Sequence, residues 1–174
     1  LSAIKNVPVS SVFVGNGSDE VIDLTFRIFC NPGKDKALTF APTYGMYEVS
    51  AEINDVELIK ITLTTDFQID FEALENYLGD ENLKLIFICS PNNPTANSLN
   101  NIEKVLQKFN GIVIVDEAYI DFSKAGSFLT KIDQYPNLIV MQTFSKAWGL
   151  AAARVGMAYS NELIISLYNK VKPP

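Results

Sequence analysis

Leu85-Ile86-Phe87-Ile88-Cys89 is an uninterrupted apolar run that ends at a turn sequence, Ser90-Pro91-Asn92-Asn93-Pro94-Thr95. A strand without alternating polar residues is typical of a sheet that is covered on both faces. Two similar apolar runs follow along the chain, one within Ile112–Asp116 and one within Leu138–Gln142. Together the three runs predict the buried centre of a mostly parallel sheet in an α/β fold.

Short β-branched and aromatic runs alternate with helical periodicity along the rest of the chain, which predicts a series of βα units joined by right-handed crossovers. In such sheets ligands bind beyond the carboxyl ends of the strands. We expect seven strands, at Val12–Val14, Ala37–Phe40, Val56–Ile61, Leu85–Cys89, Ile112–Asp116, Leu138–Gln142 and Val155–Tyr159. We expect helices at Ser18–Phe29, Gly45–Ile53, Phe71–Leu78, Ile102–Phe109, Phe128–Gln134 and Glu162–Lys170.

Composition bounds the class of protein. The chain has 174 residues, of which 48% are apolar and 20% charged, as expected for one globular domain. A net charge of -6 argues against a nucleic-acid or anionic-membrane partner, and no apolar run is long enough to cross a bilayer. The absence of histidine excludes a Ser-His-Asp triad and a His-ligated zinc site within this chain. Cys30 and Cys89 lack CxxC spacing and are expected to be buried free thiols in a reducing cytoplasm.

The two ends suggest an interior segment of a longer protein. The chain begins at Leu1 without a methionine and stops at Lys170-Val171-Lys172-Pro173-Pro174, where structure is expected to continue. The alternative is a small complete protein that is processed at both ends.

The loop after the first expected strand is suited to an anion. Val14-Gly15-Asn16-Gly17-Ser18-Asp19-Glu20 combines glycines with a helix start, whose free amides attract negative charge. It departs from the dinucleotide pattern GxGxxG at Glu20, and the chain has no GxxxxGK[ST] loop. The alternative is an ordinary capped helix start, with Ser18 as the N-cap and two acidic residues in the first turn.

Two further loops bring ring-binding groups to the same edge of the sheet. Tyr44, in Ala41-Pro42-Thr43-Tyr44-Gly45-Met46-Tyr47, is placed either to stack on a planar ring or to fill the edge of the core. Asn93, in the turn after Cys89, is placed either to donate a hydrogen bond to a phenolate oxygen or simply to form the turn.

A carboxylate closes the next strand. Asp116 ends the run Ile112–Asp116, where burial is costly unless a positive partner such as a protonated pyridine nitrogen is present. Tyr119, three residues later, is within reach of a ring oxygen. The alternative is a metal site formed by Asp116 and Glu117.

The last cluster supplies an amine. In Thr143-Phe144-Ser145-Lys146, which follows the strand ending at Gln142, Lys146 suits a Schiff base to a carbonyl cofactor. The hydroxyls of Thr143 and Ser145, with Arg154, suit the cofactor's phosphate. Taken alone, a Ser-Lys pair after a strand is more commonly a solvated turn.

The motifs GNGSDE, PTYGMY, PNNPT, DEAY and TFSKAWGLAAARVG, in this order from Phe13 to Pro174, resemble the pyridoxal-phosphate (PLP) aminotransferases of fold type I. The pairing of GNGSDE with APTYGMYEVSA is most similar to the histidinol-phosphate aminotransferases. The resemblance implies that residues 1–174 form the three-layer αβα large domain with a seven-stranded sheet, without the family's N-terminal arm and C-terminal small domain.

The resemblance also implies roles for the site residues. Lys146 would hold PLP as a Schiff base and move the proton between Cα and C4′, while Asp116 would pair with the pyridinium nitrogen. Ser18 and Asp19 would offer backbone amides to the phosphate, with the Asp19 carboxylate pointing away from it. The remaining roles are stacking by Tyr44, hydrogen bonds to the ring oxygen from Asn93 and Tyr119, and phosphate binding by Thr143, Ser145 and Arg154.

The implied reaction is a ping-pong amino transfer in which glutamate charges the cofactor and imidazole-acetol phosphate accepts the amine to give L-histidinol phosphate. A homodimer is implied for the whole protein, because the arm and a neighbouring subunit's tyrosine complete the pocket in this family. The sequence departs from the family at Ala96, where glycine is usual and positive φ would strain an alanine, and at Ala151–Ala153.

Three other interpretations remain open at this point. Another PLP enzyme of the same fold, either a decarboxylase or an aromatic or branched-chain aminotransferase, would share all these motifs. A non-catalytic remnant would have no reason to keep Lys146, Asp116 and Arg154. A nucleotide-binding α/β domain would be expected to carry one of the two missing phosphate fingerprints.

Overall fold

The computed structural model describes residues 1–172 and contains one seven-stranded sheet with the strand order β1-β7-β6-β5-β4-β2-β3. The strands are β1 Val12–Asn16, β2 Lys36–Ala41, β3 Glu57–Thr62, β4 Leu83–Cys89, β5 Ile112–Asp116, β6 Leu138–Thr143 and β7 Val155–Tyr159. The α-helices are α1 Ser2–Lys5, α2 Ser18–Phe29, α3 Met46–Ile53, α4 Phe71–Glu75, α5 Ile102–Lys108 and α6 Glu162–Val171. Four 3-10 turns lie at Val9–Ser11, Ile120–Phe122, Phe128–Lys131 and Ala151–Ala153.

Strand direction gathers the loops at one edge. β7 is antiparallel to both of its neighbours, β1 and β6, while β6-β5, β5-β4, β4-β2 and β2-β3 are parallel pairs. Every strand except β7 therefore ends at the same edge of the sheet, and β7 begins there. This confirms the mostly parallel, seven-stranded α/β sheet that the apolar runs predicted.

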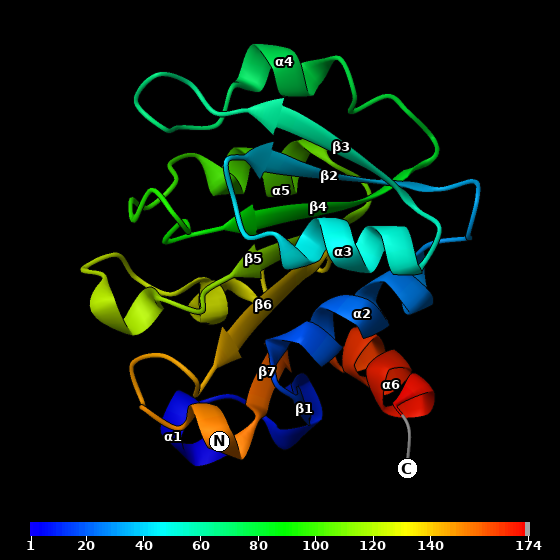
Figure 1. Cartoon of the computed structure of the whole chain (residues 1–174). Helices are drawn as coiled ribbons and strands as arrows, with labels where there is room; N and C mark the ends of the chain where they lie inside the picture. The colour runs from blue at the N-terminus through cyan, green and yellow to red at the C-terminus, as the bar shows by residue number, and fades with distance from the viewer. Residues whose placement is uncertain (173–174) are drawn as a thin grey trace.

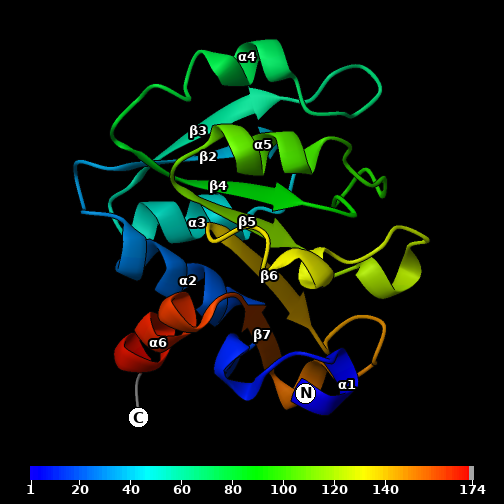
Figure 2. The same ribbon diagram turned by 180° about the vertical axis from the view of Figure 1, so that it is seen from behind.

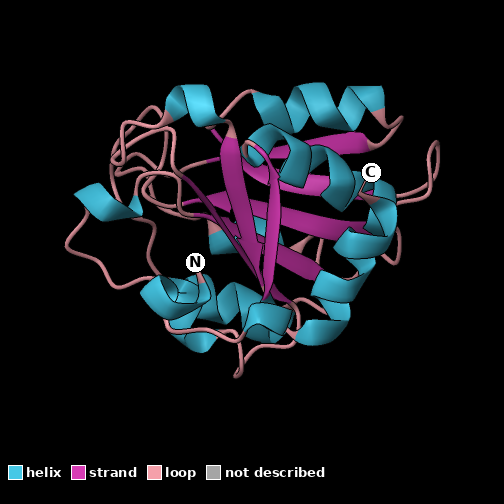
Figure 3. Cartoon of the chain, turned by 90° about the horizontal axis from the view of Figure 1, so that it is seen from below, coloured by secondary structure: helices cyan, strands magenta, loops and turns pink. Residues whose placement is uncertain are grey.

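Helices cover both faces, which makes three layers. α2, α3 and α6 lie on the face turned towards the viewer in Figure 1, and α5 lies on the opposite face, in front in Figure 2. Figure 3 shows the sheet edge-on between helices. On the first face α2 contributes Val21, Leu24 and Phe26 to a core with Phe87 and Ile139.

The opposite face of the sheet buries a second core. Its strand residues include Ile86 and Val140, and α5 covers them with Val105 and Leu106. Side chains of a strand alternate between faces, and the central strands are apolar on both. This double burial is the physical reason for the uninterrupted apolar runs in the sequence.

Two expected helices are shorter than their patterns predicted. α4 ends at Glu75 rather than Leu78, with Gly79 close behind it, and glycine is a weak helix former. The segment Phe128–Gln134 forms only a 3-10 turn at Phe128–Lys131. The proline at position 136 follows closely and disfavours helical backbone in the residue before it. Within residues 1–172 no helix has the length and apolar character that crossing a bilayer requires.

Candidate active site

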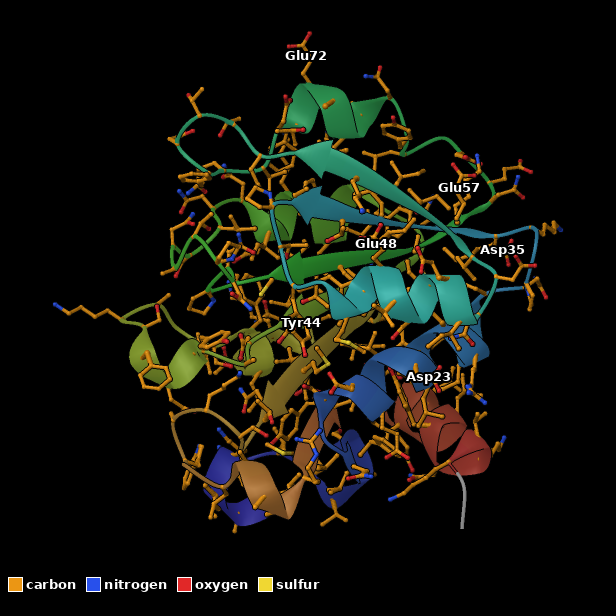
Figure 4. The ribbon with its side chains drawn as sticks, viewed as in Figure 1. Asp23, Asp35, Tyr44, Glu48, Glu57 and Glu72 are labelled. Carbon is orange, nitrogen blue, oxygen red and sulfur yellow. The ribbon has the colours of Figure 1, made fainter. Side chains whose placement is uncertain are left out.

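The loops at the carboxyl edge of the sheet enclose a small pocket. Figure 4 shows Tyr44 beside the start of α3, whereas Asp35 and Glu57 lie towards the opposite end of the strands. Residues from α2, from the loops after β2, β4 and β5, and from the loop after β6 meet there. The pocket is lined by Ser18, Tyr44, Cys89, Asn93, Asp116, Ala118, Tyr119 and Lys146. The structure thus brings six residues of the sequence-based set together: Ser18, Tyr44, Asn93, Asp116, Tyr119 and Lys146.

Two glycines allow the loop between β1 and α2 to meet Arg154. Gly17 has φ +79°, and its N–H donates to the backbone oxygen of Arg154 over 2.8 Å. A Cβ on Gly17 would collide with the Arg154 guanidinium, and a Cβ on Gly156 would collide with the backbone of Gly17 and Ser18. Because neither Cβ exists, the guanidinium lies directly beside the start of α2.

Ser18 does not cap this helix, contrary to the alternative considered above. The N-cap is Gly17, which makes no side-chain capping bond, and Ser18 is the first helical residue. Glu20 instead accepts a hydrogen bond from the Asn16 N–H at 2.6 Å, which turns the loop. The first amides of α2, starting with that of Ser18, are left without intrahelical partners and are available to an anion.

The Asp19 carboxylate lies between Arg154 and the Tyr44 hydroxyl. Its Oδ2 is 3.6 Å from Nη2 of Arg154, and its Oδ1 accepts a hydrogen bond from the Tyr44 hydroxyl at 3.1 Å. The guanidinium supplies the counter-charge that makes this position favourable. The pKa of the Tyr44 phenol is raised to about 12 by burial and by the negative charge of Asp19.

Asp116 is held by two donors and is almost completely buried, with 3% of its surface exposed. Its Oδ1 accepts from the Ala118 N–H at 3.0 Å, and its Oδ2 accepts from the Tyr47 hydroxyl at 2.6 Å. Burial raises the pKa of Asp116 from 3.8 to about 6, although these hydrogen bonds and the nearby Lys146 act in the opposite direction. Sequence reasoning missed Tyr47, whose signal was a second tyrosine three residues after Tyr44 in the same motif.

Glu117 points away from the pocket because neighbouring side chains of a strand end face opposite sides. Its carboxylate accepts hydrogen bonds from the Ser127 hydroxyl at 2.6 Å, the Phe128 N–H at 2.7 Å and the Gln142 amide at 2.9 Å. These donors occupy the carboxylate, so the metal site considered for Asp116 and Glu117 has no support from the geometry. Within residues 1–172 no three His, Cys, Asp or Glu side chains are grouped to hold a metal ion.

The two asparagines of the turn after β4 have different tasks. Asn92 is buried, and its Nδ2 donates to Pro42 O at 2.9 Å and to the Thr95 hydroxyl at 2.7 Å, while its Oδ1 accepts from Thr43 at 3.1 Å. It ties the Tyr44 loop to its own loop and leaves Asn93 to line the pocket. Ala96 has φ +61°, which confirms the strain expected at this position.

The loop after β6 carries Lys146 over the ring of Tyr119, with Nζ 5.3 Å from the ring centroid. The Thr143 hydroxyl donates to the backbone oxygen of Val155 and accepts from the Ser145 N–H, each over 3.2 Å, so it supports this loop. Thr143, Ser145, Asp19 and Arg154 are not among the residues that line the pocket itself.

Comparison with known proteins identifies the family. A model of the family described as aminotransferase class I and II matches residues 2–174 of the chain. The chain belongs to the class I and II aminotransferases. The family-level resemblance that the motifs indicated is thereby confirmed.

Two similar relatives are histidinol-phosphate aminotransferases by name. That of Bacteroides thetaiotaomicron is 56% identical over 176 residues, covering all of this chain and 51% of the relative. That of Cytophaga hutchinsonii is 54% identical over 176 residues, covering all of this chain and 50% of the relative. This class I and II aminotransferase chain therefore spans about half the length of the curated relatives it matches.

Solved structures show the same fold. The histidinol-phosphate aminotransferase from Clostridium acetobutylicum superposes on 99% of this aminotransferase chain with a TM-score of 0.88 at 25% identity, and 52% of that chain is covered. The Sinorhizobium meliloti enzyme, solved in complex with pyridoxal-5'-phosphate, covers 98% of this chain with a TM-score of 0.87 at 24% identity, and 48% of that chain is covered.

Proposed function

We propose that this chain is the cofactor-binding large domain of a PLP-dependent histidinol-phosphate aminotransferase. The reaction would exchange an amino and a keto group, so that L-histidinol phosphate and 2-oxoglutarate give imidazole-acetol phosphate and glutamate. One observation supports PLP as the cofactor: the buried Asp116 carboxylate and Lys146 line the same pocket. The relatives, more than 50% identical over the whole chain, support the substrate.

The residues present fit PLP part by part. Asp116 accepts hydrogen bonds from Tyr47 and Ala118, but within residues 1–172 no cation forms an ion pair with it. A buried carboxylate is favourable when it meets a positive charge, and the protonated ring nitrogen of PLP is such a charge. The guanidinium of Arg154, set against Gly17, suits a phosphate, and Tyr44 on the pocket wall suits a planar ring.

We assign the remaining roles by position. Ser18 and Asp19 would give backbone amides to the phosphate at the start of α2. Asn93 and Tyr119 line the pocket and would donate to the ring oxygen. Thr143 and Ser145 would complete the phosphate site; Thr143 already holds the loop between Ser145 and Val155 through its hydroxyl.

When bound, PLP supplies an electron sink that stabilises negative charge at the substrate Cα. Lys146 would hold the cofactor through Nζ and, once the substrate amine had displaced it, its free amine would take and return the proton of the substrate Cα. Asp116 would favour the protonated ring nitrogen through its negative charge. Tyr44, on the pocket wall, would cover one face of the ring.

The proposed enzyme is longer than this chain, which covers about half the length of its relatives. We infer a homodimer for the whole protein, in keeping with the family resemblance, and a cytoplasmic location, in keeping with the two free thiols Cys30 and Cys89. Small-molecule substrates are its proposed partners.

The experiment is an absorption titration of the chain with PLP, run beside Lys146→Ala. We expect a visible band that requires Lys146 and fades when L-histidinol phosphate is added. Lys124→Ala is the matched control, because it removes an exposed lysine that does not line the pocket.

Each result has a consequence for the proposal. A band that persists in Lys146→Ala would remove Lys146 from its role. A band that fades with aromatic or branched-chain amino acids but not with L-histidinol phosphate would keep the cofactor and reject the substrate. If nothing binds, the same titration on a protein extended by the segments its relatives possess would separate an incomplete pocket from a wrong cofactor.

A further inference from the structure

Tyr47 stands behind two of the groups that face the cofactor pocket, without lining the pocket itself. It is fully buried, and its hydroxyl donates to Oδ2 of Asp116 at 2.6 Å. Its ring packs against the ring of Tyr44 in a T-shaped pair, with centroids 5.8 Å apart and planes at 87°. Tyr47 is not among the site residues that the sequence motifs predicted.

The position of Tyr47 is itself fixed from behind. Its ring stacks on Phe87, with centroids 4.9 Å apart and planes at 23°, and Phe87 stacks in turn on Phe26 of α2. Aromatic pairs in these arrangements are stabilising and orient one another. The hydroxyl therefore meets Asp116 from a rigid base, and not from a mobile side chain.

We propose that Tyr47 is a positioning residue that aims the Asp116 carboxylate at the ring nitrogen of the cofactor and braces Tyr44 against the ring face. This rests on the proposed function, since both groups act on PLP. With Oδ1 held by Ala118 and Oδ2 held by Tyr47, the carboxylate is fixed in one orientation where it lines the pocket.

The hydroxyl also sets the proton state of Asp116. The charged and titratable groups around the carboxylate are Asp19, which raises its pKa, and Lys146, which lowers it; Tyr44 and Cys89 lie beside it on the pocket wall. Burial raises the pKa of Asp116 to about 6, and the bond from Tyr47 acts against that rise. Burial and Asp116 raise the pKa of Tyr47 itself, so its hydroxyl remains the donor.

Removing the Tyr47 hydroxyl is therefore expected to change the pKa of Asp116 in a known direction. In Tyr47→Phe the pKa of Asp116 rises further, so the carboxylate takes up a proton at higher pH than in the unsubstituted chain. A protonated Asp116 no longer attracts a ring N–H⁺, so PLP affinity falls as the pH is lowered through this pKa. We expect the midpoint of that fall to move up by about one pH unit, and affinity at pH 6 to drop about fivefold, because the ionised fraction of Asp116 falls by that factor.

The test measures PLP dissociation constants between pH 5.5 and 8.5 for the unsubstituted chain, Tyr47→Phe and Tyr168→Phe. Tyr168 is the matched control: it is also fully buried, and its hydroxyl bonds to Thr25 at 2.5 Å and not to the pocket. Both variants lose a buried phenol hydroxyl and are expected to lose similar stability. Only Tyr47→Phe is expected to change the pH profile.

A double-mutant cycle with Asp116→Asn gives a second reading. With an asparagine at position 116 there is no titrating carboxyl, so adding Tyr47→Phe is expected to leave the pH profile unchanged. A profile that Tyr47→Phe shifts equally in both backgrounds would overturn the proposal, as would equal profiles for Tyr47→Phe and Tyr168→Phe. Failure of the unsubstituted chain to bind PLP at any pH would instead count against the proposed cofactor, and this inference would fall with it.

Discussion

Asp116 is predicted to make the cofactor-free chain less stable at neutral pH, so that Asp116→Asn stabilises it. Burial raises the pKa of this carboxyl from 3.8 to about 6. Because the folded pKa is raised, folding favours the protonated form: this contribution is fully present below pH 3.8 and is lost as the pH rises through about 6. At 1.36 kcal/mol per pKa unit, the loss is about 3 kcal/mol.

Asparagine keeps the shape of the side chain and removes the titration. We expect Asp116→Asn to have nearly the same free energy of unfolding as the unsubstituted chain at pH 4, and to exceed it by up to about 3 kcal/mol at pH 8. Urea unfolding of both proteins without PLP, at the two pH values, measures this. The same substitution is expected to weaken PLP binding about 100-fold or more, because the buried charge that the ring nitrogen needs is gone.

Glu117→Gln is the matched control, since Glu117 is the adjacent buried carboxyl. Its oxygens accept from Ser127, Phe128 and Gln142, and an amide would turn its own N–H groups towards these donors. It is therefore expected to destabilise the chain at pH 8, by about 1–3 kcal/mol. The reasoning is refuted if Asp116→Asn lowers the free energy of unfolding at pH 8, or changes it equally at both pH values.

Three further predictions concern the loops. Gly156→Ala places a Cβ against the backbone of Ser18, so it is expected to lower the free energy of unfolding by about 1–3 kcal/mol and to weaken binding of PLP and of inorganic phosphate. Gly79→Ala is the control, because open space surrounds Gly79. Phosphate titration and thermal unfolding are expected to show no change of affinity or stability in Gly79→Ala. Ala96→Gly relieves a left-handed φ of +61° and is expected to raise the free energy of unfolding by about 1 kcal/mol in urea; a loss would contradict the strain. Asn92→Asp replaces two donated hydrogen bonds with repulsion, and is expected to lower both the melting temperature and PLP affinity; retention of both would show that this residue does not join the loops.

The sheet was predictable from the sequence because its signal is local and repeated. Ile112–Asp116 and Val155–Tyr159 form strands with the expected bounds, and the helix Ser18–Phe29 does as well. The helix expected at Phe128–Gln134 did not form, because its helical pattern is short and because Ser127 and Phe128 are hydrogen-bonded to Glu117. No local sequence pattern reveals these two bonds.

The residues that line the pocket were predictable from the sequence, but the residues that hold them in place were not. Residues after parallel strands must meet at one edge, so Asn93, Asp116 and Lys146 converge as expected. The hydrogen bond from Tyr47 to Asp116 joins residues far apart in the sequence, and the periodicity of the sequence does not predict such a contact. Asp19 meets Arg154 only because β7 runs antiparallel to its neighbours. Such contacts depend on the register of the sheet, which residue types alone do not determine.

The antiparallel course of β7 has a consequence for how the molecule forms. β1 lies at the edge of the sheet and is joined to it through β7, so the N–H of Gly17 can bond to the oxygen of Arg154 only after synthesis has passed β7. During synthesis the parallel strands β2 to β6 can assemble first, while the earliest strand waits for one of the last. A nascent chain would therefore carry the walls of the pocket before Arg154 reaches the proposed phosphate site. If the chain binds PLP as proposed, cofactor binding would be a late event that depends on the addition of β7 to the sheet.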